Sequence, residues 1–456
     1  MMGERRVMQE ALFYGFSFER HVPDEHLPRK VDRFVDLSGL RVYRGPYYSD
    51  VGRPSIDPEL MMRMLIIGYC SGVRSERRLC DEVHVNLAYR WFCWLGLDGD
   101  VPDHSTFSKN RHGRFRESDL LRKLFETVVA RCMKEGIVGG EAFAVDASMI
   151  VADANRRRGV AKVEDLDPTS SRAVAEYLSV LDDAAFGAAT PTEPKSISPT
   201  DPAARYTAAA DTPAVYAYSD NYLVDLKNAV IMDVEATTAV RPAEVGAAKT
   251  MLDRTAERFD VTPSRLVADD DSAEMVGWLV DERGIEPHVK LMDKSERTDG
   301  TFSRSDFAYD PEGNVYVCPG GKELKKYHRA FSKPRGDGLT KDGTLIYFAR
   351  KQDCDACALK PKCCPNTPAR KIARSIHEAA RDKARAIAKT DAYVVSRRER
   401  KKVEMLFAHL KRILGLGKLR LRGPSGAKDE FLLAATAQNL RKLAKLIPLP
   451  APIFAV

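Results

Sequence analysis

Residues 397–412 read RRERKKVEMLFAHLKR, and apolar side chains recur through this segment and just beyond it at helical spacing. They are Val403, Phe407, Leu410 and Leu414. The spacing predicts an amphipathic helix whose apolar stripe packs on a core. At about 100° per residue, Arg400, Glu404 and Lys411 fall within about 40° of one another on one flank of the stripe. The flank is either a surface ion pair or a metal-binding carboxylate between two cations, and the second interpretation requires further acids elsewhere.

The composition is that of an ordinary globular protein. The 456 residues are 44% hydrophobic and 30% charged, which suits about two to four domains with substantial cores. No apolar run approaches the roughly 20 residues of a membrane span, and the first residues lack the apolar segment of a signal peptide. We therefore expect a cytoplasmic protein without membrane spans.

Positive charge is concentrated near the C-terminus. Residues 370–422 contain 17 Lys and Arg but only 5 Asp and Glu, whereas the whole chain has a net charge of +7. Basic charge gathered around one helix suggests a polyanionic partner, and nucleic acid is the usual one. The alternative is an ordinary basic surface helix.

The first 138 residues are predicted to form a helical domain. Cap residues such as Asp57 and Ser75 precede amphipathic segments at the positions where helices would begin. The predicted helices cover residues 59–69, 75–83, 86–94, 105–115 and 119–134. Arginines interspersed among these short helices suit a DNA-binding domain, but they suit an ordinary helical domain equally well.

The pattern changes at Gly139, where a predicted α/β core begins and continues to residue 292. Predicted strands cover 143–151, 214–226, 229–237, 265–269 and 287–292, with helices at 242–259 and 273–283. This order indicates a mixed sheet flanked by helices. Residues 155–213 predict a long, partly mobile surface excursion with one helix near 172–184. Core helices resume over 376–447, and 448–456 form a Pro-rich tail.

Five of the nine cysteines lie in residues 293–375, where turn residues and aromatic residues predict a β-rich insertion. Four of them have spacing that suits thiolate ligands of a structural Zn²⁺. These candidates are Cys318, Cys354, Cys357 and Cys363, and Cys364 is a spare. The alternative is a set of reduced thiols in a small core. The remaining cysteines lie in apolar segments and are expected to be buried: Cys70, Cys80, Cys93 and Cys132.

Three carboxylates stand out from their surroundings. Asp146 interrupts the apolar strand 143–151, Asp269 ends the strand 265–269, and Glu404 lies on the C-terminal helix. An Asp inside a strand is unfavourable by propensity, so it usually serves another purpose. If the first and fourth strands are neighbours, the two aspartates lie side by side and the late helix brings Glu404 to them. Such oxygen ligands suit Mg²⁺ or Mn²⁺, and two ions about 4 Å apart promote displacement at a phosphodiester.

These features resemble the DDE transposases of bacterial insertion sequences, whose catalytic core is RNase H-like. The resemblance extends over most of the chain. In the N-terminal part it rests on GRPSIDP at 52–58, SER at 75–77 and PDHSTFS at 102–108. In the core it rests on VDAS at 145–148, LVAD at 266–269 and the spacing Arg400-x3-Glu404-x6-Lys411, which is the family's C-terminal signature. The implied fold is an RNase H-like mixed sheet, preceded by an all-α domain and interrupted by the Cys-rich β insertion.

The resemblance implies a Mg²⁺- or Mn²⁺-dependent enzyme in which Asp146, Asp269 and Glu404 hold the metal ions. Basic residues of the last signature would contact DNA phosphates near the cleaved bond: Arg400, Lys411, Arg397 and Lys401. The implied reaction is hydrolysis at a transposon end, which frees a 3′-hydroxyl, followed by attack of that hydroxyl on target DNA. The implied partners are terminal inverted repeats and target DNA, with a homodimer holding two ends together.

The chain departs from the family pattern at two places. The Tyr that usually begins the signature is replaced by Arg397, and the loop after the second acid reads DDDS at 269–272, about two residues shorter than usual. Either Asp270 or Asp271 substitutes as a ligand, or the loop is damaged. The alternative function is therefore a catalytically impaired, transposase-derived DNA-binding protein.

Overall fold

The computed structural model describes residues 15–44, 55–113, 119–155, 159–208, 213–270, 272–291, 297–326, 339–340 and 343–449. Residues 52–54, Asp271 and the tail from residue 450 therefore lie outside the described residues. The chain forms two compact units, a first unit of Met1–Thr262 with Lys401–Val456 and a second unit of Pro263–Arg400. Within the described residues, no helix combines the length and the apolar character that crossing a membrane requires.

The N-terminal part of the first unit is helical, as predicted. The Asp57 carboxylate accepts a hydrogen bond from the Glu59 N–H at 3.0 Å, and Ser75 and Asp103 cap two later helices in the same way. The helices are α1 (Phe18–His21), α2 (Leu27–Asp32), α3 (Leu40–Arg44), α4 (Pro58–Cys70), α5 (Glu76–Val85), α6 (Leu87–Phe92), α7 (His104–His112) and α8 (Leu120–Lys134). The four cysteines of this region are buried free thiols, as expected.

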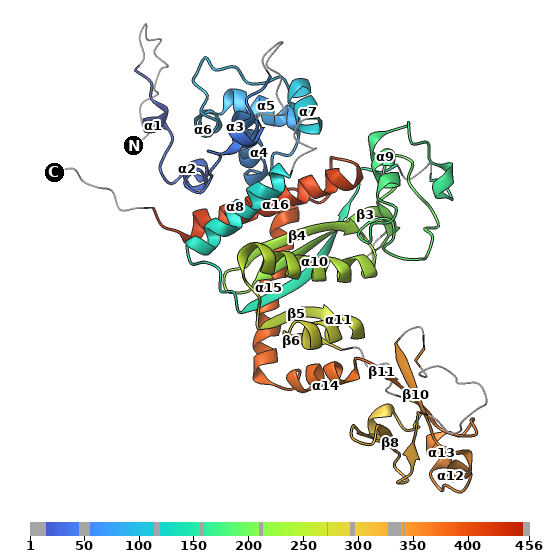
Figure 1. The fold of residues 1–456 in the computed structure, drawn as a ribbon. Helices are drawn as coiled ribbons and strands as arrows, with labels where there is room; N and C mark the ends of the chain where they lie inside the picture. Colours follow the sequence, from blue (N-terminus) through green and yellow to red (C-terminus); the bar gives the residue numbers. More distant parts are fainter. Residues whose placement is uncertain are drawn as a thin grey trace, which may run out of the picture. The chain divides into compact units, whose positions relative to one another are not determined.

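The core of the first unit forms around α16 (Gly423–Leu446), which is buried along most of its length. Pro424 occupies its first turn, where the fixed φ of proline suits the start of a helix. The helix packs on α4 and α8, on α9 (Arg172–Ser179) and on strand β4 (Val230–Thr238) (Figure 1). Its buried amide Asn439 exchanges two hydrogen bonds, of 2.8 and 2.9 Å, with the Ile231 backbone on β4.

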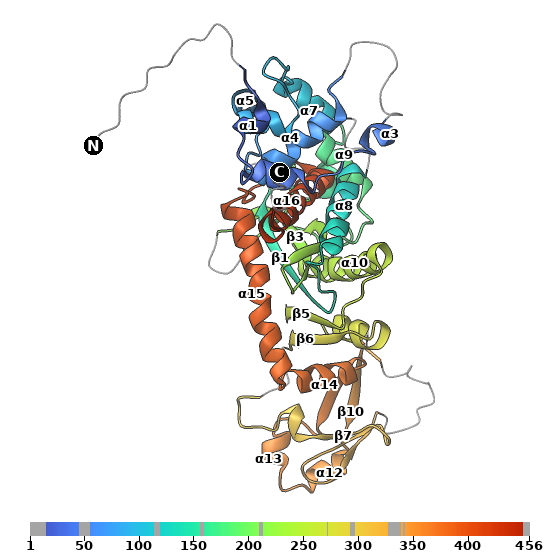
Figure 2. The ribbon, with the colours of Figure 1, turned by 90° about the vertical axis from the view of Figure 1, so that its left-hand side faces the viewer.

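An antiparallel sheet adjoins α16 in the first unit. Strand β1 (Ala142–Val151) pairs with β3 (Val215–Asp225), and β3 pairs with β4 and, near its start, with β2 (Arg205–Thr207). Asp225 closes one end of this sheet, because its carboxylate accepts hydrogen bonds from the N–H groups of Gly139 and Gly140. Helix α10 (Arg241–Phe259) covers one face, and residues 401–412 of α15 (Asp391–Arg412) lie on the other side of β1 and β3 (Figure 2).

The predicted surface excursion at 155–213 is only partly on the surface. It contains η2 (Val163–Asp165), α9 and β2, and several of its residues are buried, including Ile197, Ser198 and Asp201. The Tyr218 hydroxyl of β3 donates a hydrogen bond to the Asp201 carboxylate at 2.5 Å. Composition suggested a mobile segment because it is rich in Pro, Ser and Thr, but it is attached to the sheet through contacts such as the 2.8 Å hydrogen bond between the Ser196 and Tyr216 hydroxyls.

The second unit contains a parallel strand pair and a helix packed on it. Strand β5 (Arg265–Asp270) pairs with β6 (Glu286–Lys290), connected through α11 (Ala273–Gly277) and η3 (Trp278–Glu282). Helix α14 (Glu378–Ile387) packs on this crossover through small residues, Ala380 and Ala384, against Val276 and Val289. The order strand, helix, strand is the one that the sequence predicted.

The described residues of the Cys-rich segment 293–375 also lie in the second unit and form short strands and helices. Its strands are β7 (Ala308–Asp310), β8 (Val315–Val317), β9 (Glu323–Leu324), β10 (Thr344–Phe348) and β11 (Lys371–Ser375), and its helices are η4 (Arg304–Asp306), α12 (Lys351–Asp355) and α13 (Lys360–Cys363). A small core of aromatic residues, including Tyr316 and Tyr347, holds these short strands together. Cys363 and Cys364 are buried in the same core.

Candidate active site and basic pocket

Asp146 lies in the middle of β1, directly opposite Tyr222 of β3. Side chains of directly opposed residues in an antiparallel pair project from the same face of the sheet. Asp146 is half-buried, and its carboxylate accepts a hydrogen bond from the following N–H, that of Ala147, at 2.8 Å. The contacts of Tyr222 therefore show which elements cover the face of the sheet that carries Asp146.

The first-unit part of α15 packs on the face that carries Asp146 and Tyr222. The ring of Phe407 stacks on Tyr222 with 4.9 Å between the ring centroids and 14° between the planes. The Tyr222 hydroxyl donates to Gln438 Oε1 of α16 at 3.1 Å, and Gln438 in turn donates to the Leu406 carbonyl at 2.8 Å. Tyr222 and Gln438 thus fix the height of α15 above the sheet.

Contacts along α15 give its direction over the sheet. Lys402 donates from Nζ to the Leu226 carbonyl, Phe407 stacks on Tyr222, and Lys411 acts electrostatically on Asp220. The helix therefore runs opposite to β3. Glu404 lies between Lys402 and Phe407, so it stands about one turn, roughly 5 Å along the axis, from the level of Asp146. The first unit thus contains two of the three predicted acids, Asp146 on β1 and Glu404 on the helix that packs on this face of the sheet, with Lys411 further along the helix.

Asp220 belongs to the same face, and the sequence analysis missed it. It lies opposite Ser148 on β1 and is 0% exposed, and neither carboxylate oxygen has a hydrogen-bond partner among the described residues. Burial raises the pKa of Asp220 well above its ordinary value, which the Tyr222 hydroxyl and the Lys411 ammonium group offset only in part. The signal was available, because an Asp in an apolar strand is the anomaly that singled out Asp146.

The second unit holds the third predicted acid. Asp269 lies near the end of β5, where the register of the β5–β6 pair shifts, and its side chain is 71% exposed. Its carboxylate forms an ion pair with Arg400 Nη1 at 2.6 Å. Arg265, four residues before Asp269 on β5, and Glu399, directly before Arg400, form a second ion pair at 3.2 Å. These two ion pairs connect the N-terminal part of α15 to β5.

The remaining predicted contacts are divided between the units. Arg397 and Lys401 are exposed on α15, the first in the second unit and the second in the first unit. Because Asp146 and Glu404 belong to the first unit and Asp269 to the second, the convergence of all three acids stays a prediction. Among the described residues, no group of three or more His, Cys, Asp or Glu side chains is arranged to hold a metal ion.

The cysteines of the insertion lie in one neighbourhood. A Cβ built on Gly320 would stand 3.4 Å from Cys357 Sγ and 3.7 Å from Cys318 Sγ, and the Lys322 N–H donates to Cys318 Sγ at 3.3 Å. Burial raises the pKa of the Cys354 thiol, whose other neighbours include Cys364 and Cys318. These contacts join Cys364, which the sequence treated as a spare, to the predicted set.

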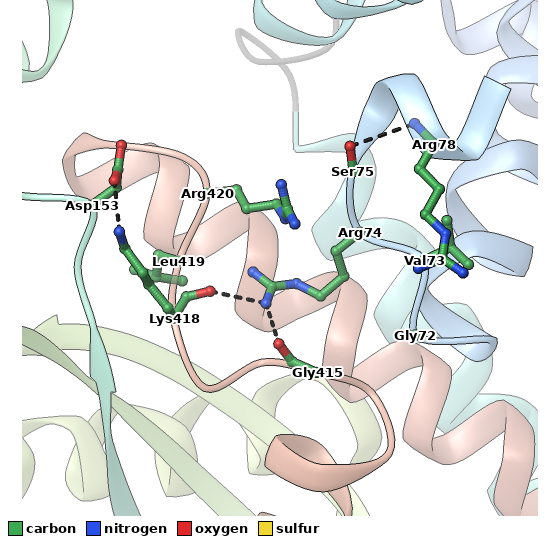
Figure 3. Close-up of a pocket in the computed structure, with 10 residues that line it drawn as sticks. All are labelled: Gly72, Val73, Arg74, Ser75, Arg78, Asp153, Gly415, Lys418, Leu419 and Arg420. Carbon is green, nitrogen blue, oxygen red and sulfur yellow. Dashed lines mark hydrogen bonds and ion pairs between the residues drawn. The ribbon is translucent and has the colours of Figure 1, made fainter. Parts of the chain in front are cut away.

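The first unit also contains a pocket of about 450 Å³, which we call the basic pocket (Figure 3). It lies between the segment before α5 and the segment after α15. Its lining residues are Gly72, Val73, Arg74, Ser75, Arg78, Asp153, Gly415, Lys418, Leu419 and Arg420. Four of them are cationic and one is acidic. The positive charge of residues 370–422 is evident from the sequence, but the proximity of Lys418 and Arg420 to Arg74 and Arg78 is not.

Comparison with known proteins identifies two domains. Residues 16–113 match the model of a transposase domain (DUF772), and residues 317–444 match that of a transposase DDE domain. The second match includes Arg400, Glu404 and Lys411, whereas Asp146 and Asp269 lie before it. No curated protein matches the chain significantly.

One solved structure with some similarity is a cryo-EM structure of the piggyBac transposase synaptic complex with hairpin DNA. Its match covers 93% of this chain and 80% of that chain, at 11% sequence identity and a TM-score of 0.34. At so low a TM-score, no correspondence between individual elements is drawn.

Proposed function

We propose that the chain is an insertion-sequence DDE transposase, which cleaves DNA at the ends of its element and joins the freed 3′-hydroxyl to a target site. The observation that best supports this proposal is the packing of α15, which carries Glu404 and Lys411, on the sheet face of Asp146 through the stack of Phe407 on Tyr222. In-line displacement at phosphorus depends chiefly on positioning and charge neutralisation, and this face offers both carboxylates and a cation.

Asp146, Asp269 and Glu404 would hold Mg²⁺ or Mn²⁺, which would activate the nucleophile and stabilise the leaving oxygen. The carboxylates at this site are accessible, since Glu404 is exposed and the Asp269 side chain is 71% exposed. Arg400, now paired with Asp269, would exchange this partner for a DNA phosphate. Lys411, Arg397 and Lys401 would contact phosphates on either side of the cleaved bond.

Strand nicking of a duplex that carries the inverted repeat of the flanking element, with Mg²⁺ present, tests the proposal. We expect cleavage by the wild-type chain and its loss in Asp146→Ala and Glu404→Ala. Arg258→Ala serves as a matched surface control, because Arg258 makes only a long 3.8 Å ion pair with Glu126. Cleavage that survives both acid substitutions would refute the assignment of these residues.

A catalytically impaired DNA-binding protein is the second candidate function. The observation that favours it is the short DDDS loop at 269–272, together with the pairing of Asp269 with Arg400. In this case the wild-type chain binds the same duplex but does not nick it with Mg²⁺ or Mn²⁺. Inserting two residues after Asp269 would then be the appropriate repair, and recovery of nicking would locate the defect in this loop.

The finer architecture follows from the same proposal. The antiparallel strands of the first unit and the parallel pair of the second unit would be parts of one RNase H-like sheet, with the Cys-rich segment inserted between core elements. A homodimer would hold two inverted repeats together while they are cleaved. Sedimentation of the chain with and without end duplex tests the dimer, and a 1:1 monomeric complex at all concentrations would contradict it.

A structural Zn²⁺ is the second proposed metal, held by thiolates of the insertion. Cys318, Cys354, Cys357 and Cys363 were the predicted ligands, and Cys364 lies beside both Cys354 and Cys363. Binding would require these thiols to draw together and would stabilise the insertion. Metal analysis of purified protein should give about one zinc per chain, lost in Cys357→Ser, and the separate variants Cys363→Ser and Cys364→Ser show which of these two thiols is the fourth ligand. Absence of zinc from the wild type would remove the proposal.

A further inference from the structure

We infer that the basic pocket binds a backbone phosphate of the DNA on which the active site acts. The inference rests on the proposed function, and it adds a binding position outside the three predicted acids. The pocket is built by segments that are far apart in sequence but belong to the same unit, namely residues 72–78, Asp153 and residues 415–420. It therefore joins the helical N-terminal domain to the segment that follows the catalytic helix.

A buried ion pair holds the floor of the pocket in place. Arg74 is 8% exposed and pairs with Glu430 of α16, while its Nη1 donates to the carbonyls of Gly415 and Lys418 at 2.6 and 2.9 Å. Glu430 also accepts hydrogen bonds of 2.6 Å from the N–H groups of Arg420 and Leu421. Because Arg74 is neutralised by Glu430 and both of its Nη groups donate to protein atoms, it positions the loop and does not itself offer charge to a ligand.

The cations at the mouth are accessible and weakly compensated. The side chain of Arg420 has no hydrogen bond or ion pair within the described part of the chain, although its backbone N–H is held by Glu430. Arg78 is 69% exposed and contacts Glu82 at 3.3 Å, and Lys418 is 60% exposed and contacts Asp153 at 3.0 Å. Exposed ion pairs of this kind contribute little and exchange readily for a phosphate.

The shape of the pocket also suits a phosphate. Gly72 has a φ of +73°, and a Cβ at this position would stand 2.6 Å from the Ile413 carbonyl oxygen, so the two walls approach closely behind the opening. A volume of about 450 Å³ admits a phosphate with its sugar, and the lining is too polar for an apolar ligand. Figure 3 shows the Arg420 side chain reaching over the Arg74 guanidinium, on the side away from Gly415.

The position of the pocket relative to Asp146 connects it with the reaction. Leu419 donates its N–H to the Val151 carbonyl at 2.7 Å, so the pocket loop pairs with the end of β1. Val151 is five residues beyond Asp146 on the same strand, a distance of about 17 Å. The bound phosphate would therefore be a few nucleotides from the one that is cleaved.

Salt-dependent binding of a fluorescent random-sequence duplex, measured without divalent metal, tests the pocket apart from cleavage. Each phosphate contact contributes about 0.9 to the slope of log K against log salt. We expect Arg420→Ala to lower this slope by about 1 and to weaken binding about tenfold on every sequence. Arg420→Lys should retain most of the slope, and Arg258→Ala, on another surface of the first unit, should not change it.

A methylphosphonate scan of the end duplex tests the expected position. Neutralising one phosphate at a time should weaken wild-type binding at a position a few nucleotides from the nick, and Arg420→Ala should be insensitive at that position only. An unchanged salt slope in Arg420→Ala would overturn the pocket assignment even if Asp146 and Glu404 prove catalytic. A reduced slope in a chain that does not nick DNA would support the pocket while refuting the proposed catalysis.

Discussion

The buried acids on the two faces of the first unit's sheet differ in whether their carboxylates have partners. On the face covered by α10, Asp233 is 2% exposed, and its carboxylate pairs with Arg122 at 2.5 Å and with Arg254 at 2.7 Å. On the face covered by α15, Asp220 is equally buried, yet it has no hydrogen-bond partner among the described residues. Asp146 on this second face is half-buried.

The difference separates structural acids from functional ones. A buried carboxylate with two arginines and a backbone N–H is satisfied, and removing it takes the carboxylate from Arg122 and leaves Arg254 with Glu235. A buried carboxyl without a partner lowers stability unless it becomes neutral, so it is retained for another reason. We therefore expect substitutions on the α10 face to affect folding and substitutions on the α15 face to affect cleavage.

The largest expected effect is the loss of DNA cleavage in the Glu404→Gln variant. The substitution removes a metal-binding charge from an exposed position of α15, so nicking should fall at least about a thousandfold, which corresponds to about 4 kcal/mol. The unfolding midpoint should change little. On the α10 face, Asp233→Asn should show the reverse pattern, with lower stability and normal nicking per folded molecule. If both variants lost stability and activity together, the acids on the two faces would not differ in function.

The second expected effect is on stability. Asp233→Ala leaves Arg122 and Arg254 without their shared partner inside the protein and should lower the free energy of unfolding by about 3 to 5 kcal/mol. Glu135→Ala is the control, because its i,i+4 pair with Arg131 is partly exposed and should cost less than about 1 kcal/mol. Urea unfolding followed by circular dichroism measures both. Equal losses of unfolding free energy in Asp233→Ala and Glu135→Ala would show that the buried ion pairs of Asp233 contribute no more than an exposed pair.

The same comparison shows what the sequence could predict. Strand boundaries, the helix 397–412 and the anomalous Asp146 were visible because periodicity and propensity are local properties. Residues 155–213 were misjudged because polar composition does not reveal that Asp201 is buried and accepts a hydrogen bond from Tyr218. The basic pocket could not be predicted, because it depends on contacts between Arg74 and residues more than 300 positions later.

The third expected effect is a change in pH dependence. Burial raises the pKa of Asp220, so in the wild type stability declines as pH rises from the unfolded value of about 4 through the folded value. Asp220→Asn removes this decline, by up to about 1.4 kcal/mol per pH unit, and should be the more stable protein at pH 8.

Thermal unfolding between pH 4.5 and 8 measures the difference between wild type and Asp220→Asn. Asp201→Asn is the control, since the pKa of Asp201 is raised to about 7 by burial, and its contribution should therefore level off near pH 7. A wild-type profile that the Asp220→Asn substitution leaves unchanged would mean that Asp220 carries no proton at these pH values.

The smallest expected effect concerns the contact that sets α15 on the sheet. Tyr222→Phe deletes the hydroxyl that donates to Gln438 but keeps the stack on Phe407, so stability should fall by about 1 kcal/mol and nicking by less than about threefold. On the other face, Ser219→Ala deletes a hydrogen bond of 2.8 Å to Glu244 of α10 and should cost a similar amount with no change in nicking. Tyr222→Ala also removes the stack. If the stack positions Glu404, Tyr222→Ala should have a lower kcat per folded molecule than Tyr222→Phe. Equal kcat values per folded molecule in the two variants would mean that the rest of α15 determines the position of Glu404.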